Sequence, residues 1–161
     1  MEGDIVSVRM AEMSTVRESG RLKTILGSCV GVILYDPARR ISGMAHAMLP
    51  RRVRGDTAVG KYADTAIPAL LALVRDGHSR AGALRAYLVG GATMFAQASP
   101  KLASIGDQNV SAAREALHQA AVPIVFEDIG GTRGRSVLFD NQRGDVSVHT
   151  LSPVATTRGT E

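Results

Sequence analysis

The stretch CVGVILYDPARRISGMAHAML, residues 29–49, decides the fold that we expect for this chain. Two apolar runs, residues 29–35 and 41–49, flank the turn sequence Asp36-Pro37-Ala38-Arg39-Arg40. Proline suits the second position of a β-turn because its ring fixes φ in the range needed there. The pattern predicts a β-hairpin that is apolar on both faces, so we expect its sheet to be covered on both sides.

The length of the turn decides how Cys29 on the first strand relates to His46 on the second. If Pro37 and Ala38 form a two-residue turn, Cys29 lies directly opposite His46, with Cβ atoms about 4.5–5.5 Å apart. If Ala38 and Arg39 form the turn, the pair is diagonal on one face, at about 7–8 Å. A three-residue turn places the pair on opposite faces. Most of these registers therefore bring a thiol and an imidazole together.

A thiol beside an imidazole is the pair that a cysteine hydrolase requires. A free thiol with a pKa of about 8.5 is only a few per cent thiolate at neutral pH, and a neighbouring histidine can take its proton. Cys29 would then attack a carbonyl, His46 would protonate the leaving group, and water would hydrolyse the thioester. Backbone N–H groups around Gly27, Ser28 and Cys29 are candidates to hold the oxyanion, because small residues let a substrate approach.

Each of these residues also has a purely structural interpretation. A lone cysteine in an apolar run is commonly a small buried hydrophobe, and a histidine on an apolar strand is commonly a satisfied core residue. Ser28 suits a turn. Met44, Met48 and Met94 are most simply core residues, although Met48 could flank a substrate.

The remaining segments predict further strands and two helices. We expect strands at residues 5–8, 22–26, 84–89 and 122–126, a second hairpin from residues 136–139 and 146–148, and loops at residues 15–20 and 51–60. Helical spacing indicates helices at residues 62–76, ending at Gly77, and at residues 108–121, capped by Asp107. Pro68 argues against an unbroken first helix. Strands cluster at both ends of the chain, so we expect an α+β fold of layered mixed β-sheets, sandwich-like and flanked by two main helices.

Length and composition indicate one soluble domain. The chain has 161 residues, 45% of them hydrophobic and 21% charged, so we expect residues 1–161 to form a single domain, with residues 152–161 as a frayed tail. The single cysteine excludes an intrachain disulfide and a zinc site built on paired cysteines. Because Glu2 and Asp4 do not suit a signal peptide and no apolar run reaches the ~20 residues of a membrane span, we expect a cytoplasmic protein.

The charge pattern says little about partners. The formal net charge is +4, and the one tight basic run, Arg51, Arg52 and Arg54, has no aromatic residue beside it. This run suits a solvated loop or contact with an acidic protein better than nucleic-acid binding. His78, His118 and His149 lack a Cys or carboxylate at ligand spacing, so we expect neither metal nor cofactor.

Several spaced motifs resemble the signature of the CheD family. They are residues 26–32 (LGSCVGV), Tyr35-Asp36-Pro37, residues 43–50 (GMAHAMLP), residues 60–64 (GKYAD), residues 90–95 (GGATMF), Ile105-Gly106 with Asn109-Val110, and residues 130–136 (GGTRGRS). The resemblance covers roughly residues 20–140. Because these motifs occur in the family's order, the resemblance is specific.

The resemblance implies a chemoreceptor glutamine deamidase that converts selected receptor glutamines to glutamate and so regulates chemotaxis. The family's nucleophile matches Cys29 and its base matches His46. The implied fold is similar to the deamidase domain of cytotoxic necrotizing factor toxins. The implied partners are the cytoplasmic domains of methyl-accepting chemoreceptors and, in some bacteria, the phosphatase CheC.

The chain departs from the family pattern at two positions. Lys23 stands where the family commonly has a threonine that orients the histidine, and Thr24 follows it. Adjacent strand residues point to opposite faces, so we expect Thr24 to take that role only if the strand bulges. The second departure is Gln108, where the family often has arginine.

Two other functions remain open on the sequence alone. The chain could be a binding module that docks a receptor or a CheC-like phosphatase without catalysis, which the departure at Lys23 favours. It could also be a redox-sensing thiol protein. A deamidase requires Cys29 for activity, whereas docking does not.

Overall fold

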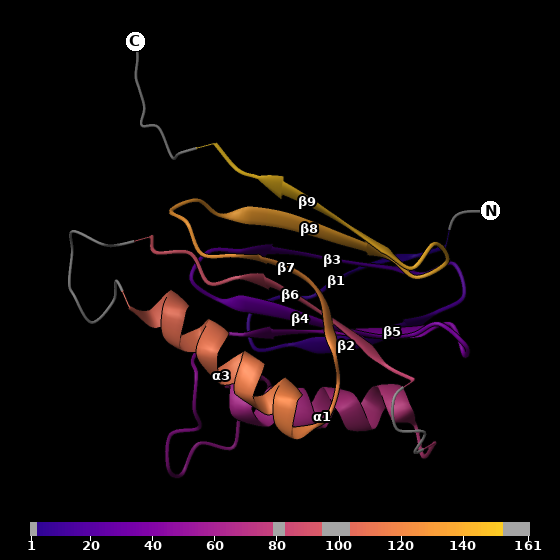
Figure 1. Cartoon of the computed structure of the whole chain (residues 1–161), viewed down its shortest axis with the longest axis horizontal. Coiled ribbons are helices and arrows are strands. Elements are labelled where there is room, and N and C mark those ends of the chain that lie inside the picture. The colour runs from indigo at the N-terminus through magenta and orange to yellow at the C-terminus, as the bar shows by residue number, and fades with distance from the viewer. Residues whose placement is uncertain (1–2, 79–82, 95–103, 153–161) are drawn as a thin grey trace.

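A computed structural model describes residues 3–78, 83–94 and 104–152 of the chain (Figure 1). The strands are β1 (Ile5–Ser7), β2 (Met13–Arg17), β3 (Arg21–Leu26), β4 (Val30–Asp36), β5 (Ile41–Ala47), β6 (Arg85–Gly90), β7 (Ile124–Ile129), β8 (Arg135–Asp140) and β9 (Asp145–Thr150). The helices are α1 (Ala63–Arg75), α3 (Ile105–Gln119) and a short 3-10 turn at Val59–Lys61. The frayed tail that we expected at residues 152–161 lies, apart from Ser152, outside the described residues.

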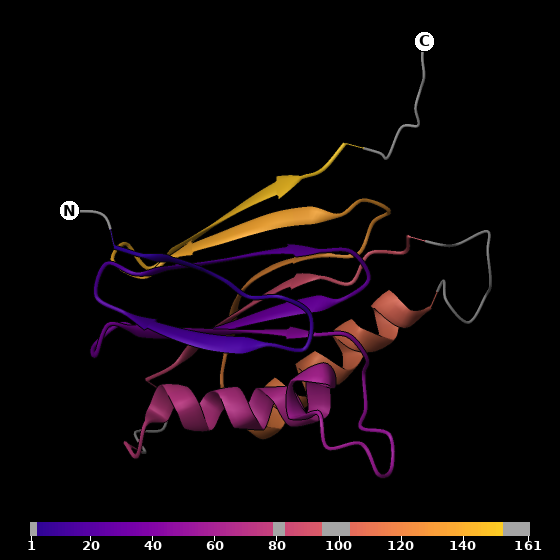
Figure 2. The same cartoon turned by 180° about the vertical axis from the view of Figure 1, so that it is seen from behind.

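The strands form two stacked sheets, and the helices make a third layer. One sheet has the order β1-β3-β8-β9 and the other has the order β2-β5-β4-β6-β7. Each sheet contains one parallel pair, β1–β3 and β6–β7, among antiparallel pairs. Helices α1 and α3 cover one face of the five-stranded sheet, and the four-stranded sheet covers its other face (Figures 1 and 2). The expected α+β fold of layered mixed sheets with two main helices is confirmed.

The hairpin of β4 and β5 lies at the centre of this arrangement. Every residue of both strands is buried, as the apolar character of both runs predicted. One face of the hairpin packs on the helices through residues such as Val32 and Ala45. The other face packs on the four-stranded sheet through residues such as Ile33 and Met44. The two cores therefore meet across this hairpin.

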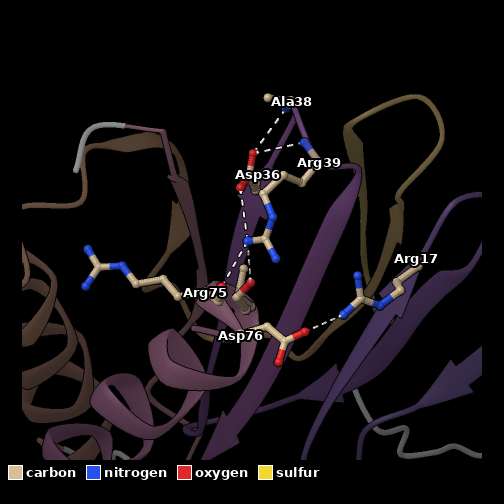
Figure 3. A network of polar contacts seen from close by, with 7 residues as sticks. Arg17, Asp36, Ala38, Arg39, Arg75 and Asp76 are labelled. Carbon is tan, nitrogen blue, oxygen red and sulfur yellow. Dashed lines mark hydrogen bonds and ion pairs between the residues drawn. The ribbon is translucent and has the colours of Figure 1, made fainter. Parts of the chain in front are cut away.

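The hairpin turn is held by a carboxylate and tied to a helix end (Figure 3). Asp36 Oδ1 accepts hydrogen bonds from the backbone N–H groups of Ala38, at 3.1 Å, and Arg39, at 3.2 Å. The Arg39 guanidinium donates to the carbonyls of Val74 and Arg75, each at 3.1 Å, at the end of α1. Because these contacts fix the turn around Ala38 and Arg39, they select one of the three registers that the sequence allowed.

Four local expectations were wrong. Residues 15–20 are not a loop, since β2 occupies Met13–Arg17 and pairs as an edge strand with β5 through backbone bonds that its polar side chains do not prevent. Helix α1 continues through Pro68 because that residue lies on the exposed side, where water can satisfy the carbonyl that loses its partner. Asp76, not Gly77, is the left-handed C-cap of α1, and α3 begins at Ile105 after Ser104, with Asp107 inside its first turn.

Candidate active site

Cys29 lies in a bend that links β3 to β4 at one end of the two-sheet stack. All three carbonyls of this bend accept hydrogen bonds from the protein: Gly27 from the N–H of Ala92 at 3.0 Å, Ser28 from the Asn109 side chain at 2.9 Å, and Cys29 from the N–H of Gly91 at 2.8 Å. The N–H groups of residues 27–29 donate to no other residue in the part of the chain that the structure describes. The bend therefore directs its carbonyls to the protein and leaves its N–H groups without a partner from another described residue.

His46 shares a face of the hairpin with Cys29. The observed register pairs Gly31 with His46 and Val30 with Ala47, which is the register with a turn centred on Ala38 and Arg39. Cys29 is then diagonal to His46, a relation typical of about 7–8 Å on a common face. That face lies between the two sheets, where Cys29 packs against the inter-sheet core. The structure shows no hydrogen bond between thiol and imidazole in the part of the chain it describes.

Thr24 holds the imidazole in one orientation. Its hydroxyl donates to the carbonyl of Val8 at 2.6 Å, and its oxygen lies 2.8 Å from Nδ1 of His46. The Val8 carbonyl also lies 3.3 Å from Nδ1. Because the hydroxyl proton is used on Val8, both oxygens near Nδ1 are acceptors, so Nδ1 carries the proton. A neutral imidazole then has its lone pair at Nε2.

The contact of Thr24 with His46 forms without a bulge in β3. Residues 21–26 pair with residues 140–135 of β8 in one unbroken register. Thr24 is one of the buried residues of β3, whereas Lys23 is exposed on the opposite face. Our expectation that Thr24 contacts His46 only if β3 bulges was therefore wrong. It assumed that the inward-facing residue of β3 stands at the family's usual threonine position, which is Lys23 in this chain. The alternation of β3 itself places Thr24 inward.

Burial biases both reactive groups toward their neutral forms. Desolvation raises the pKa of the Cys29 thiol above its ordinary value, and the residue's own backbone N–H acts in the opposite direction. Desolvation also lowers the pKa of the His46 imidazole, against the opposing effects of the Val8 carbonyl and the Glu12 carboxylate. The pair is therefore a thiol and a neutral base at neutral pH, rather than a stable thiolate–imidazolium pair.

Comparison with known proteins identifies the family of this chain. Residues 48–150 match the family model described as CheD chemotactic sensory transduction. The chain is 39% identical over 158 residues to the chemoreceptor glutamine deamidase CheD of Halalkalibacterium halodurans, covering 92% of this chain and 94% of that protein. It is 41% identical over 151 residues to the probable chemoreceptor glutamine deamidase CheD of Moorella thermoacetica, covering 91% of this chain and 90% of that protein.

The chain belongs to the CheD family. A weaker likeness in structure is to the Neisseria meningitidis protein NMB0706, with a TM-score of 0.48 and 12% sequence identity, covering 80% of this chain and 64% of that one. The resemblance read from the spaced motifs is confirmed by the family match and by the identity to CheD relatives along most of the chain.

Several CheD motifs meet around Cys29. Gly91 and Ala92, from the GGATMF motif, donate to the cysteine bend, and the N–H of Thr93 donates to the carbonyl of Gly131 in the GGTRGRS motif, at 2.8 Å. Met94, which we expected in the core, is 37% exposed and lies next to Gly27. Motifs far apart in the sequence thus build one end of the molecule.

The sequence reasoning gave no role to Asn109. This residue of α3 is completely buried and its amide nitrogen donates to the carbonyls of Ser28, at 2.9 Å, and Met48, at 3.0 Å. A buried asparagine on the apolar face of a helix was the available signal, because such a residue needs partners from another element.

A groove of about 860 Å³ opens beside His46 and Thr24 and runs over the outer face of the four-stranded sheet. Ile5, Met10 and Ile25 line it and are all exposed. His149 lies on β9 and lines the groove too. Cys29 is not part of this lining.

The described residues contain no group of His, Cys, Asp or Glu side chains arranged to hold a metal ion. Within that same part of the chain, no helix is long and apolar enough to cross a membrane.

Proposed function

We propose that this chain is a cytoplasmic protein-glutamine deamidase that converts glutamines of chemoreceptor cytoplasmic domains to glutamate and thereby regulates chemotaxis. The observation that carries the proposal is the bond between Thr24 and Nδ1 of His46. It leaves Nε2 as the basic nitrogen, on the strand face that Cys29 shares. The names of the CheD relatives support glutamine as the target.

The reaction requires two halves that use the same two side chains. Cys29 Sγ attacks the amide carbon of a glutamine side chain while Nε2 of His46 takes the thiol proton. The imidazolium then protonates the amide nitrogen, the carbon–nitrogen bond breaks, and ammonia leaves a thioester on Cys29. Water attacks the thioester, His46 takes its proton, and the released thiolate recovers that proton from the imidazolium. The net change is glutamine and water to glutamate and ammonia.

The bend at residues 27–29 is suited to stabilise the negative charge that develops on the amide oxygen. Its N–H groups donate to no other residue of the described chain, whereas its carbonyls are all bound. Donors fixed in place before the reaction stabilise an oxyanion without further reorganisation. Gly27 and Ser28 add little side-chain bulk, so a glutamine can approach these donors.

Mass spectrometry of a co-expressed chemoreceptor tests this function. The wild-type chain should produce the mass shift of glutamine to glutamate at specific receptor positions, and Cys29→Ala should abolish it while circular dichroism shows a retained fold. Cys29→Ser is the closer control, because it keeps the size and polarity of the side chain and loses the thiol. Unchanged deamidation in the Cys29→Ala chain would refute the proposal.

The groove on the four-stranded sheet favours a second candidate, a binding module for a receptor or a CheC-like phosphatase. Its apolar lining with exposed Ile5, Met10 and Ile25 suits contact with another protein. A pull-down in which wild type and Cys29→Ala capture receptor equally, with no deamidation by either, would favour this role over catalysis.

A further inference from the structure

Asn109 joins the two segments that carry the reactive side chains. Its amide nitrogen donates to the carbonyl of Ser28, the residue before Cys29, and to the carbonyl of Met48, two residues after His46. The residue is fully buried in α3. One side chain from a helix therefore links the thiol segment to the end of the imidazole strand.

The link lies where the central hairpin opens. The β4–β5 ladder ends at the pair Val30 and Ala47, and the same register would next pair Cys29 with Met48. The backbones do not continue as a ladder there, since the carbonyls of Ser28 and Met48 both turn to the Asn109 amide. Asn109 thus takes the place of cross-strand hydrogen bonds beside the thiol segment.

Close backbone packing places α3 for this task. A Cβ atom on Gly106 would lie 2.5 Å from the carbonyl oxygens of both Gly91 and Ala92, so only glycine lets the first turn of α3 come so near. Asn109 follows Gly106 by one turn, on the same side of the helix. Gly91 and Ala92 in turn donate to the carbonyls on either side of Ser28.

The carbonyl oxygen of the Asn109 amide makes no hydrogen bond to any described residue, so the contribution of this side chain lies in its two N–H donors. Asn109 Oδ1 is buried and has no hydrogen-bond partner in the described chain. A buried acceptor without a partner costs free energy that an apolar side chain would avoid. An apolar side chain would leave the Ser28 and Met48 carbonyls without their donor, however, and only an amide of this length supplies both bonds.

We propose that Asn109 is a positioning residue that fixes the Cys29 bend relative to the end of β5, with the N–H groups of the bend facing the substrate. The inference rests on the proposed deamidation for its kinetic readout. Its second readout, the reaction of the Cys29 thiol with iodoacetamide, does not depend on any substrate.

The chain offers a matched control in Asn141. This residue is also fully buried, its amide nitrogen also donates to two carbonyls, those of Glu18 at 2.9 Å and Arg40 at 2.8 Å, and its Oδ1 also lacks a partner among the described residues. Arg40 lies in the turn at the opposite end of the hairpin from Cys29. Replacing either asparagine by alanine therefore removes two hydrogen bonds from a buried amide to backbone carbonyls, but at opposite ends of the hairpin.

The experiment compares Asn109→Ala with Asn141→Ala in deamidation kinetics on a receptor cytoplasmic domain and in the rate of Cys29 alkylation at pH 7. We expect both variants to lose similar thermal stability. Asn109→Ala should lower kcat by about 10- to 100-fold with KM changed less than about twofold, because the reacting groups are misplaced and binding is not. The same variant should alkylate more than about twofold faster than wild type, because the half-buried thiol becomes more accessible. Asn141→Ala should change neither rate.

A kcat or an alkylation rate of Asn109→Ala within about twofold of Asn141→Ala would overturn the assignment. If Asn109→Ala does not fold, Asn109→Ser, which keeps one donor, is judged by the same two criteria. A chain that folds with Asn141→Ala but with neither Asn109 variant would show a purely structural role and would also overturn it. A wild-type chain that leaves receptor glutamines intact would refute the proposed function instead, and the alkylation rates would still decide the role of Asn109.

Discussion

Thr24 and Lys23 are neighbours on β3 whose side chains point to opposite faces of the four-stranded sheet. Thr24 is 7% exposed and reaches His46, whereas Lys23 faces the outer groove. The orientation of the base therefore depends on the register of one short strand. A polar contact of this kind matters because it selects which imidazole nitrogen carries the proton.

Replacement of Thr24 by valine should slow deamidation without unfolding the chain. Valine keeps the shape of threonine but cannot accept a hydrogen bond from the Nδ1–H of His46. We therefore expect kcat to fall by about 10- to 100-fold, as when a partner that orients a histidine is lost. Thr65→Val is the control, because the Thr65 hydroxyl also donates to a carbonyl, at 2.6 Å, but on α1. Equal kinetics of the two variants would show that Thr24 does not orient the base.

The lowered pKa of His46 predicts the acid limb of the activity. Burial places the pKa of His46 in the folded protein below the ordinary value of 6.5. The neutral imidazole should therefore persist below pH 6.5, and kcat/KM should begin to fall only below that pH. As the pH falls, His46 is protonated in the unfolded chain at a higher pH than in the folded chain. The stabilising contribution of neutral His46 is therefore complete above 6.5 and is lost as the pH falls through the folded pKa.

An NMR titration of the His46 imidazole, together with the pH dependence of kcat/KM, checks this prediction. A His46 midpoint at or above the ordinary value of 6.5 would contradict the expected effect of burial.

At the scale of elements, the β4–β5 hairpin sets the geometry of the site through its turn. Asp36 is 4% exposed, bonds two backbone N–H groups of the turn and lies 3.5 Å from the Arg39 guanidinium. We expect Asp36→Ala to lower the free energy of unfolding by about 1–3 kcal/mol, because two part-buried hydrogen bonds to a buried carboxylate are lost. Urea denaturation measures this change.

Asp140 is the matched control for Asp36. Its Oδ1 accepts from the backbone N–H groups of Gln142, at 3.0 Å, and Arg143, at 3.1 Å, in the β8–β9 turn, but these groups are exposed. Water can replace the lost acceptor there, so Asp140→Ala should cost less than about 1 kcal/mol. A larger loss from Asp140→Ala than from Asp36→Ala would show that burial of the turn is not what decides its contribution.

At the scale of the whole molecule, an aromatic cluster packs between the two sheets. Phe139 of β8 is fully buried and packs edge-to-face against Tyr35 of β4, with ring centroids 5.3 Å apart, and against Tyr87 of β6, at 5.1 Å. These contacts cross from the four-stranded to the five-stranded sheet. They join the sheet of Thr24 to the sheet of His46, so their packing also maintains the site.

Phe139→Ala should lower the free energy of unfolding by about 3–5 kcal/mol, the usual cost of a cavity left by a buried aromatic ring. Phe126→Ala is the control, since Phe126 is only half-buried at the edge strand β7, and it should cost clearly less. Guanidinium unfolding followed by tyrosine fluorescence and by far-UV circular dichroism gives both values. Similar losses in the two variants would indicate that the inter-sheet cluster is not the main link.

The sequence by itself determined the central hairpin, the layered α+β fold and the candidate pair of Cys29 and His46. These followed from local information, because an uninterrupted apolar run must be buried on both faces and a proline turn limits the possible registers. The family likeness also followed from the sequence, since its motifs are short and occur in a fixed order. The edge strand β2 escaped prediction because its polar residues pair through the backbone alone.

Only the tertiary structure decided the register of the hairpin, the partner of His46 and the contacts of Asn109. The register depends on Arg39 reaching the end of α1, and the imidazole tautomer depends on Thr24 and Val8 meeting at Nδ1. Each of these contacts joins residues far apart in the chain. Their geometry comes from how the sheets and helices stack, which the pattern within a single segment does not contain.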